Sequence, residues 1–403
     1  MLNNDSAYMI GRRYYIFLMV FLGALSAFGP FITDFYLPTL PSLASIFSTT
    51  PSMVQLGLTS SMLGIAVGQL LFGPVSDKYG RRPLLVASLL LFFISTVAII
   101  FSPTIEFFNV CRFLQGLGGS GGIVMSRSVA TDCYTGRELA KTLSIVGAIN
   151  GVAPVVAPLI GGVVANDIGW QGVFFILLAI GGVLLAMCGR FRESLPLEKR
   201  SKGNVLNVAG SFISLMRRPL FRMYIAVFGL AYGVLFAYIS SATFIVQEHF
   251  NFSEMQFSVV FAFNAIGTAL GSALTLRFRK MQNAALFSTA GMTLFTALLL
   301  FTTLCVESFL IYEALTFMMM FSLGFIFPSV TTLAMSEGRN SVGAASAIVG
   351  AVGFVFGGIV SPLVGLGDMM FSSVAVMFVC ASLSLVFALF CKRRANLWDS
   401  QAG

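Results

Sequence analysis

Long apolar runs recur along the whole chain and constrain its fold more than any other feature. Twelve runs reach the length that a helix needs to cross a bilayer, roughly 20 predominantly apolar residues. They occupy residues 14–37, 53–73, 83–101, 107–130, 141–164, 171–189, 221–246, 257–276, 284–304, 308–335, 341–366 and 370–391. Because a helix satisfies its own backbone hydrogen bonds inside lipid, we predict an all-α membrane protein with twelve transmembrane helices.

Composition leaves no room for a separate soluble domain. The 403 residues are 57% hydrophobic and only 10% charged, against about 25% charged residues in an ordinary soluble domain. The longest polar interruption is residues 190–220. We therefore predict an N-terminal six-helix half at residues 1–189 and a C-terminal half at residues 221–403, joined by this linker, in which the segment FISLM forms an amphipathic helix.

The basic residues predict the orientation in the membrane, because Lys and Arg collect in short cytoplasmic loops. With the N-terminus placed inside, 22 of the 24 Lys and Arg fall in the tails and in alternate loops. The other loops contain no Lys or Arg and carry acids instead: Glu106, Asp167, Glu248, Glu254, Glu307 and Asp368. We predict that both termini are cytoplasmic and that the net charge of +8 reports this topology, so nucleic acid is not an expected partner.

One carboxylate lies where lipid is expected. The stretch FGPFITDFYLPTLP places Asp34 late in the first apolar run. A carboxylate within a spanning helix is normally functional, as a proton relay or as the counter-charge of a substrate, and Gly29 and Pro30 predict a bend that would line a cavity. The alternative is that the helix ends at Asp34 in the outer headgroups, since Pro38 and Pro41 follow closely.

The loop after the second run carries the most specific motif. Its sequence GPVSDKYGRRP resembles the signature of the major facilitator superfamily between helices 2 and 3, with Gly73, Asp77, Gly80, Arg81 and Arg82 in place. Gly80 permits a tight turn, the two arginines anchor the inner face, and Asp77 can cap a helix N-terminus or pair with an arginine in one conformation only. Asp132 belongs to the same predicted latch, although it follows Thr131, where relatives often have Arg.

Arg112 lies about two turns inside the fourth run and must face protein or water. The run Arg112-x-x-Gln115-Gly116 resembles a superfamily signature common in proton-coupled members. Asp34 comes 21 residues after Arg13, or roughly 32 Å of helix, and Arg112 comes six residues after Glu106, or roughly 9 Å, so both fall in the outer half of the membrane. We predict that Arg112 lies within hydrogen-bonding or one-water reach of the Asp34 site.

Two further side chains are assigned to the same proton-coupling and substrate cavity. Tyr36 follows Asp34, and Glu313 in the tenth run lies at a similar expected depth. The alternative for Glu313 is an outer-interface residue.

The glycines of the fourth run fit two soluble-enzyme patterns, one with Gly116, Gly118 and Gly121 and one with Ser120 between Gly118 and Gly122. Both patterns need a strand before the motif, so close helix packing explains these glycines better.

The fifth run resembles the signature of superfamily antiporters. Its small and kinking residues are Gly147, Gly151, Pro154, Pro158, Gly161 and Gly162. Together with TDFYLPTLP and TGRELAK, the resemblance narrows to the bicyclomycin-resistance (Bcr/CflA) type of drug/proton antiporter. The alternative is any tightly packed membrane helix.

This resemblance implies a multi-pass, monomeric protein of a bacterial cytoplasmic membrane, which exports small hydrophobic or cationic molecules in exchange for protons and uses no cofactor. An exporter of a native metabolite, such as a sugar, an amino acid or a nucleoside, is the alternative. A remote alternative is an intramembrane enzyme that uses Ser120.

Overall fold

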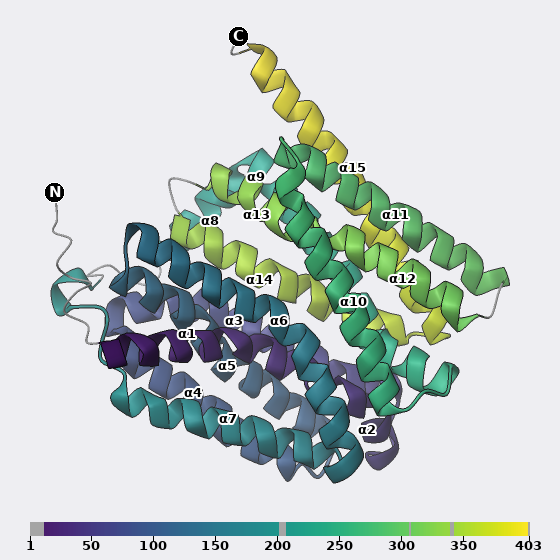
Figure 1. Cartoon of the computed structure of the whole chain (residues 1–403), viewed down its shortest axis with the longest axis horizontal. Helices are drawn as coiled ribbons and strands as arrows, with labels where there is room; N and C mark the ends of the chain where they lie inside the picture. Colours follow the sequence, from purple (N-terminus) through teal and green to yellow (C-terminus); the bar gives the residue numbers. More distant parts are fainter. Residues whose placement is uncertain (1–11, 201–206, 306–307, 339–341, 402–403) are drawn as a thin grey trace.

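Every regular element in the part of the chain that the structure describes is a helix (Figure 1). The structure is a computed structural model, and it describes residues 12–200, 207–305, 308–338 and 342–401. The first half contains α1 (Arg12–Asp34), η1 (Leu37–Thr39), α2 (Leu40–Ile46), α3 (Pro51–Tyr79), α4 (Arg81–Ile100), α5 (Ile105–Cys133), α6 (Gly136–Ile168) and α7 (Trp170–Arg190). A short η2 (Leu197–Lys199) and α8 (Asn207–Arg217) follow, and α8 contains the segment that was expected to be helical.

The second half repeats this pattern with more interruptions. It contains α9 (Pro219–Phe244), η3 (Ile245–His249), α10 (Glu254–Leu274), η4 (Thr275–Arg277), α11 (Met281–Cys305), α12 (Phe309–Gly324), α13 (Ile326–Glu337), α14 (Val342–Val360), η6 (Ser361–Gly365) and α15 (Met369–Gln401). The expected run at 308–335 is therefore two helices. They separate beside Gly324, where a Cβ atom would lie only 2.1 Å from the Thr268 carbonyl oxygen of α10.

Ten helical segments of the described residues are long and apolar enough to cross a membrane. Helices α5 and α6, of 29 and 33 residues, occupy the places of the other two expected runs. Helix α5 is less apolar because Gly and Ser fill its middle from Gly116 to Gly122. The all-helical fold is thus confirmed, with ten candidate membrane spans identified by length and apolar composition.

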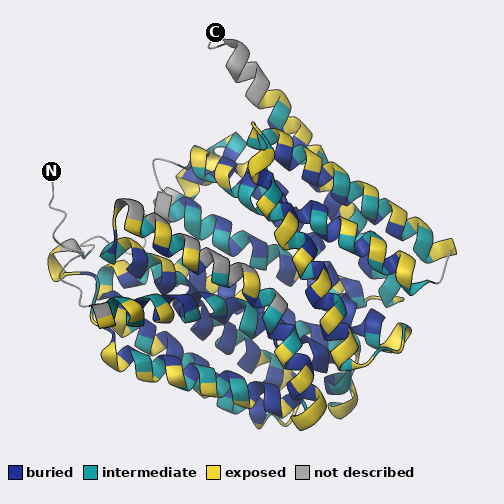
Figure 2. Cartoon of the chain, viewed as in Figure 1, coloured by how far each residue is buried: buried dark blue, intermediate teal, exposed yellow. Residues whose placement is uncertain are grey.

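The outside of the bundle is apolar, as a surface in contact with lipid must be. Ile94 of α4, Val183 of α7 and Phe301 of α11 expose 60% or more of their surface. Figure 2 shows buried residues concentrated between the helices and exposed ones on the outward faces. In water, such large apolar surfaces would be a liability, so they favour a membrane environment.

The two halves meet along two helix pairs, α3 with α14 and α6 with α10 (Figure 1). Hydrogen bonds between the halves, among the residues described, all involve the start of α3 or η1. Ser52 Oγ donates to the Gly365 carbonyl at 2.8 Å, Gln55 Nε2 to the Ser240 carbonyl at 3.1 Å, and Gln247 Nε2 to the Pro38 carbonyl at 3.1 Å. This end of the molecule is closed.

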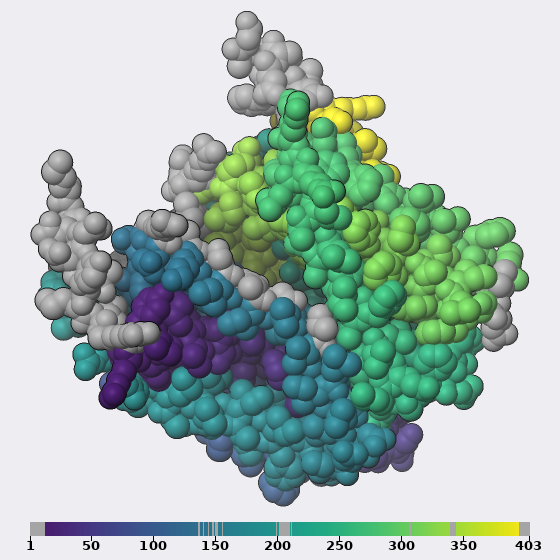
Figure 3. Space-filling view, in the orientation of Figure 1, coloured from purple at the N-terminus to yellow at the C-terminus, as the bar shows by residue number. Residues whose placement is uncertain are grey.

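The opposite end is open. Helices α6 and α10 touch near Gly162 and Ser258 and diverge from there toward the start of α6 and the end of α10. Figure 3 shows the surface hollowed between these two helices, with α14 behind them. The molecule therefore has the shape of a V that is joined at the end carrying residues 35–50.

Candidate functional site

Asp34 is the last residue of α1, and its carboxyl is enclosed by protein. Asp34 is only 4% exposed, and its Oδ1 has no hydrogen-bond partner among the described atoms. Pro30 remains inside α1, and the chain passes from Asp34 through η1 and α2 before α3 begins. The helix thus ends at Asp34, as the alternative interpretation expected, but the carboxyl is buried within the protein.

Arg112 joins four helices at the centre of the first half. It is fully buried, and its Nη2 donates to the Ile32 carbonyl of α1 at 2.8 Å and to Ser61 Oγ of α3 at 3.1 Å. Its Nη1 donates to Gln115 Oε1, and Gln115 Nε2 donates to Thr96 Oγ1 of α4 at 2.8 Å. The two residues of the predicted helix 4 signature therefore act together, as one hydrogen-bonded unit.

The guanidinium of Arg112 also lies over aromatic rings. Its centre is 4.1 Å from the ring centroid of Tyr36 and 5.7 Å from that of Phe174 in α7. Arg112 therefore contacts the chain on both sides of Asp34. It binds the carbonyl of Ile32, two residues before Asp34, and lies over the ring of Tyr36, two residues after it. No ion pair joins the Arg112 and Asp34 side chains within the described ranges. Arg112 Nε, the Tyr36 hydroxyl and Asp34 Oδ1 are buried without partners.

The helix 5 motif explains how other helices approach this site. A Cβ atom on Gly161 would lie 2.0 Å from the Phe35 carbonyl oxygen, so only glycine lets α6 pack against the backbone that follows Asp34. A Cβ atom on Gly162 would lie 2.1 Å from Ser258 Oγ of α10, in the other half. Pro154 and Pro158 lie inside α6, with Pro158 buried. The surroundings of Gly147 and Gly151 fall outside what the structure describes.

We expect Gly162→Ala to destabilise the folded protein by about 1–3 kcal/mol, because the added methyl group overpacks the joined end of the V. A lower melting temperature of the purified protein in detergent would show this. Gly189→Ala is the matched control, since no atom lies within 4 Å of the position its Cβ would take. Equal melting temperatures for the two variants would contradict the close contact.

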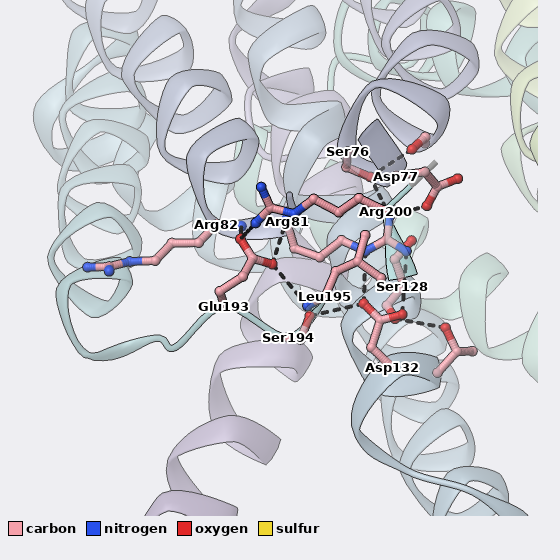
Figure 4. A network of polar contacts seen from close by, with 12 residues as sticks. Ser76, Asp77, Arg81, Arg82, Ser128, Asp132, Glu193, Ser194, Leu195 and Arg200 are labelled. Carbon is pink, nitrogen blue, oxygen red and sulfur yellow. Dashed lines mark hydrogen bonds and ion pairs between the residues drawn. The ribbon is translucent and has the colours of Figure 1, made fainter. Parts of the chain in front are cut away.

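The predicted inner-loop latch forms a dense polar network (Figure 4). Arg81 Nη1 lies 2.6 Å from Asp77 Oδ1, and Arg81 Nε lies 2.9 Å from Asp132 Oδ2. Arg81 Nη1 also donates to Ser76 Oγ at 2.5 Å. Gly80 has a φ of 105°, which L side chains rarely adopt, so this glycine is required for the turn between α3 and α4.

Glu193 completes this network and was not among the predicted site residues. Its Oε1 accepts from the Arg81 backbone N–H at 2.9 Å and its Oε2 from that of Arg82 at 3.1 Å, so it caps the N-terminus of α4. Arg82 Nε donates back to the Cys188 carbonyl at the end of α7, at 3.2 Å. In the sequence this acid lies among the many basic residues of the 190–220 linker, so no pattern distinguished it. Gly73, by contrast, has no atom within 4 Å of its Cβ position, so packing does not require glycine there.

The two aspartates that pair with Arg81 should differ in their effect on stability. The Asp132 side chain is 14% exposed and that of Asp77 is 53% exposed. Asp132→Ala should cost about 1–3 kcal/mol, because it leaves Arg81 Nε and Ser194 Oγ without the acceptor that they share, Asp132 Oδ2. Asp77→Ala should cost under about 1 kcal/mol, as exposed ion pairs do. Urea or thermal unfolding of both purified variants would measure the difference, and the reverse ranking would contradict it.

Arg127 of α5 is a second residue that the sequence interpretation passed over. Its side chain is exposed, and its guanidinium interacts electrostatically with the phenol of Tyr232 in α9, which belongs to the other half. Arg127 therefore faces the gap between the halves. The sequence contained one signal for it: of the 24 Lys and Arg residues, only Arg127 and Arg112 lie outside the basic loops and tails.

Glu313 lies apart from the Asp34 site, in α12 of the second half. Asn264 Nδ2 of α10 donates to Glu313 Oε1 at 2.9 Å and also to the Tyr238 hydroxyl of α9 at 3.0 Å. No hydrogen bond that the structure describes connects this group with Arg112 or Asp34. The expected single cavity site is therefore two polar sites, one in each half.

A bundle of membrane-length helices whose halves part at one end, with charged groups buried in its helices, defines a membrane transporter. The intramembrane-enzyme alternative is wrong: Ser120 is fully buried within a continuous α5, and its Oγ donates to the Leu117 carbonyl at 2.7 Å. The family model described as Major Facilitator Superfamily matches residues 16–362. The chain belongs to the major facilitator superfamily.

Individual relatives agree with this assignment. The chain is 36% identical to the "Uncharacterized MFS-type transporter YdgK" of Bacillus subtilis (strain 168), over 94% of this chain and 96% of that protein. It is 28% identical to the "Bicyclomycin resistance protein homolog" of Haemophilus influenzae, over 66% of this chain and 67% of the relative. Among solved structures, a bacterial homolog of the human lysosomal transporter Spinster matches 97% of this chain and 98% of its own with a TM-score of 0.73 at 15% identity, which shows the shared fold.

Proposed function

We propose that this protein exports small hydrophobic or cationic molecules in exchange for protons, by alternating access between its two halves. The observation that carries the proposal is the Asp34 carboxyl, which is buried at the end of α1 with Oδ1 unpaired and lies close to the contact between α6 and α10. The Haemophilus influenzae relative, named for bicyclomycin resistance, supports a drug as the exported molecule.

The proposed topology has twelve spans, both termini in the cytoplasm and the chain in a bacterial inner membrane as a monomer. Helices α5 and α6 supply the two spans beyond the ten that length and apolar composition identify. With the basic loops inside, the closed end faces outward and the hollow in Figure 3 opens to the cytoplasm. The structure then corresponds to an inward-facing state.

Coupling needs only that a proton and the substrate compete for one site. A substrate entering from the cytoplasm displaces the proton from Asp34, and a proton arriving from outside displaces the substrate after the halves rock. In the inward-facing state Asp77 is half exposed beside Arg81. It is then available to cap a neighbouring helix N-terminus when the cytoplasmic ends close, which is the latch role expected of the inner-loop motif.

Arg127 narrows the proposed substrate class. A guanidinium that faces the gap between the halves repels a cation and attracts neutral polar or anionic groups. Neutral hydrophobic molecules with polar groups therefore fit the site better than permanently cationic ones. Export of a native metabolite is the alternative, and the same polar groups could serve it.

Uptake into everted membrane vesicles tests the proposal. Vesicles that contain the protein should accumulate labelled bicyclomycin when their interior is acidified, and an uncoupler should abolish the accumulation. Vesicles carrying no transporter are the control. Bicyclomycin accumulation that depends on neither the pH gradient nor the uncoupler would overturn proton exchange. If the pH gradient drives accumulation only of sugars, amino acids or nucleosides, the metabolite alternative is favoured.

A further inference from the structure

The second half contains a largely enclosed polar group that the proposed cycle does not use. It consists of Glu313 in α12, Asn264 in α10 and Tyr238 in α9, held together by the two hydrogen bonds that the Asn264 amide donates. Asn264 is fully buried and Tyr238 is 1% exposed. The ring of Tyr238 stacks on Phe261, with centroids 5.7 Å apart, so the group is fixed by packing as well as by hydrogen bonds.

The hydrogen-bond capacity of this group is incomplete. Both amide hydrogens of Asn264 are used, so Asn264 has none left for the second carboxyl oxygen of Glu313. Glu313 Oε2 and Asn264 Oδ1 are buried without partners, as are the nearby Tyr312 hydroxyl and Thr316 Oγ1 in α12. Glu313 as a residue is half-buried, but its Oε2 is enclosed by protein. An ionised Glu313 would therefore be a largely desolvated charge with one hydrogen bond and no counter-charge, which is costly.

No cation offsets that cost in the described surroundings. The titratable groups that face Glu313 are the phenols of Tyr238 and Tyr312. Helix α9 also carries Arg222, Tyr224 and Tyr232, which all precede Tyr238 by six residues or more. The charged or titratable residues of the other neighbouring elements are Glu248 and His249 in η3, Glu254 at the start of α10, and Glu337 at the far end of α13. Helix α11 carries only Cys305, at its last position. A proton on the carboxyl is therefore the simplest way to neutralise this site.

We propose that Glu313, Asn264 and Tyr238 form a second proton-binding site, which is filled and emptied separately from Asp34. In the conformation described here, Glu313 is a neutral acid. Binding and release are a simple exchange, in which the carboxylate takes one proton and returns it without any other bond changing. The role of this site in a transport cycle rests on the proposed proton exchange, but its occupancy does not.

The closed end of the molecule provides the link to conformational change. Tyr238 lies two residues before Ser240, whose carbonyl accepts the hydrogen bond from Gln55 of the first half. Segment η1, which follows Asp34, packs against both α9 and α10. When this end opens, the Gln55 contact breaks and α9 moves relative to the first half, so water gains access to the Glu313 site from the outer side.

Infrared difference spectroscopy of the purified protein in lipid vesicles tests this without any substrate. The carbonyl stretch of a protonated carboxyl is separate from that of a carboxylate, and it shifts in D2O. The wild-type protein should show two protonated carboxyl bands that titrate with pH. Asp34→Asn should remove one band and Glu313→Gln the other, each leaving its partner in place. Glu106→Gln, at an exposed position on α5, is the matched control and should leave both bands.

A further variant tests the geometry directly. Asn264→Leu removes the donor to Glu313, so the Glu313 band should move to higher wavenumber while the Asp34 band stays fixed. Retention of both bands in Glu313→Gln, or an unmoved band in Asn264→Leu, would overturn the second site. If bicyclomycin uptake fails while both carboxyl bands behave as described, the proposed substrate class is wrong and the second proton site stands.

Discussion

Asp34→Asn is expected to abolish uphill export while leaving the protein folded. Asparagine has almost the same shape as aspartate but cannot exchange a proton, and Asp34 is a buried carboxyl with one oxygen unpaired. The variant should therefore lose all pH-driven bicyclomycin accumulation in everted vesicles. Its melting temperature should match or exceed that of the wild type, because the substitution removes a desolvated carboxyl and creates no cavity.

A second measurement separates loss of coupling from loss of binding. Substrate counterflow, in which labelled substrate enters vesicles already loaded with unlabelled substrate, needs binding and rocking but no net proton movement. Asp34→Asn should retain counterflow. Asp167→Asn, an exposed aspartate at the end of α6, is the matched control and should retain both activities. Uphill accumulation by Asp34→Asn at the wild-type level would show that another group carries the proton.

Sequence alone predicted most of the fold because lipid imposes a single strong constraint. An apolar run of spanning length has almost no choice but to form a helix, and the ten helices that are long and apolar enough to cross a membrane follow the expected runs. Interruptions were harder to predict. The break between α12 and α13 lies at a close helix contact between Gly324 and α10, and such contacts depend on which helices become neighbours. Hydropathy contains no such information.

The sequence predicted which residues form the candidate site better than it predicted which residues contact one another there. Arg112 was correctly expected to lie near the Asp34 segment, because motif and depth both placed it there, and Gln115 belongs to the same motif and binds Arg112. Their partners, the Ile32 carbonyl and the hydroxyls of Ser61 and Thr96, have no recognisable pattern in the sequence. The same is true of Asn264, an uncharged amide that becomes notable only when α10 brings it to Glu313.

The separation of Glu313 from Asp34 shows the limit of depth arguments. Both residues were placed in the outer half from residue counts along their helices, and counting cannot distinguish positions around the bundle. Contacts do so: Arg112 binds the backbone of α1, whereas Glu313 binds α10 of the other half. Equal depth was therefore compatible with one shared site or with two separate ones. The contacts with neighbouring helices show two separate sites.

Arg112→Lys should slow transport about tenfold or more, because lysine cannot reproduce the donor pattern of the guanidinium. Arg112 donates to Ile32, Ser61 and Gln115 from two nitrogen atoms, and a compact ammonium cannot reach all three. A hydrogen bond from a charged group contributes about 1.5–3 kcal/mol to the arrangement that it holds. A transport step that needs this arrangement slows about tenfold for each 1.4 kcal/mol lost, so the loss of one bond suffices. Initial uptake rates in everted vesicles would measure the change, with Arg279→Lys at an exposed position as the control.

Tyr36→Phe distinguishes the two ways in which Arg112 could act on this site. The guanidinium lies over the ring of Tyr36, and the hydroxyl of that ring makes no hydrogen bond of good geometry but does interact electrostatically with Arg112. If Arg112 holds the backbone after Asp34 by packing on the ring, phenylalanine preserves that contact and transport should stay within about twofold of wild type, since cation–π attraction does not need the hydroxyl. A loss as large as that of Arg112→Lys would mean instead that the hydroxyl contacts the substrate or the proton, and Asp34, Tyr36 and Arg112 would then have to be treated as one binding site.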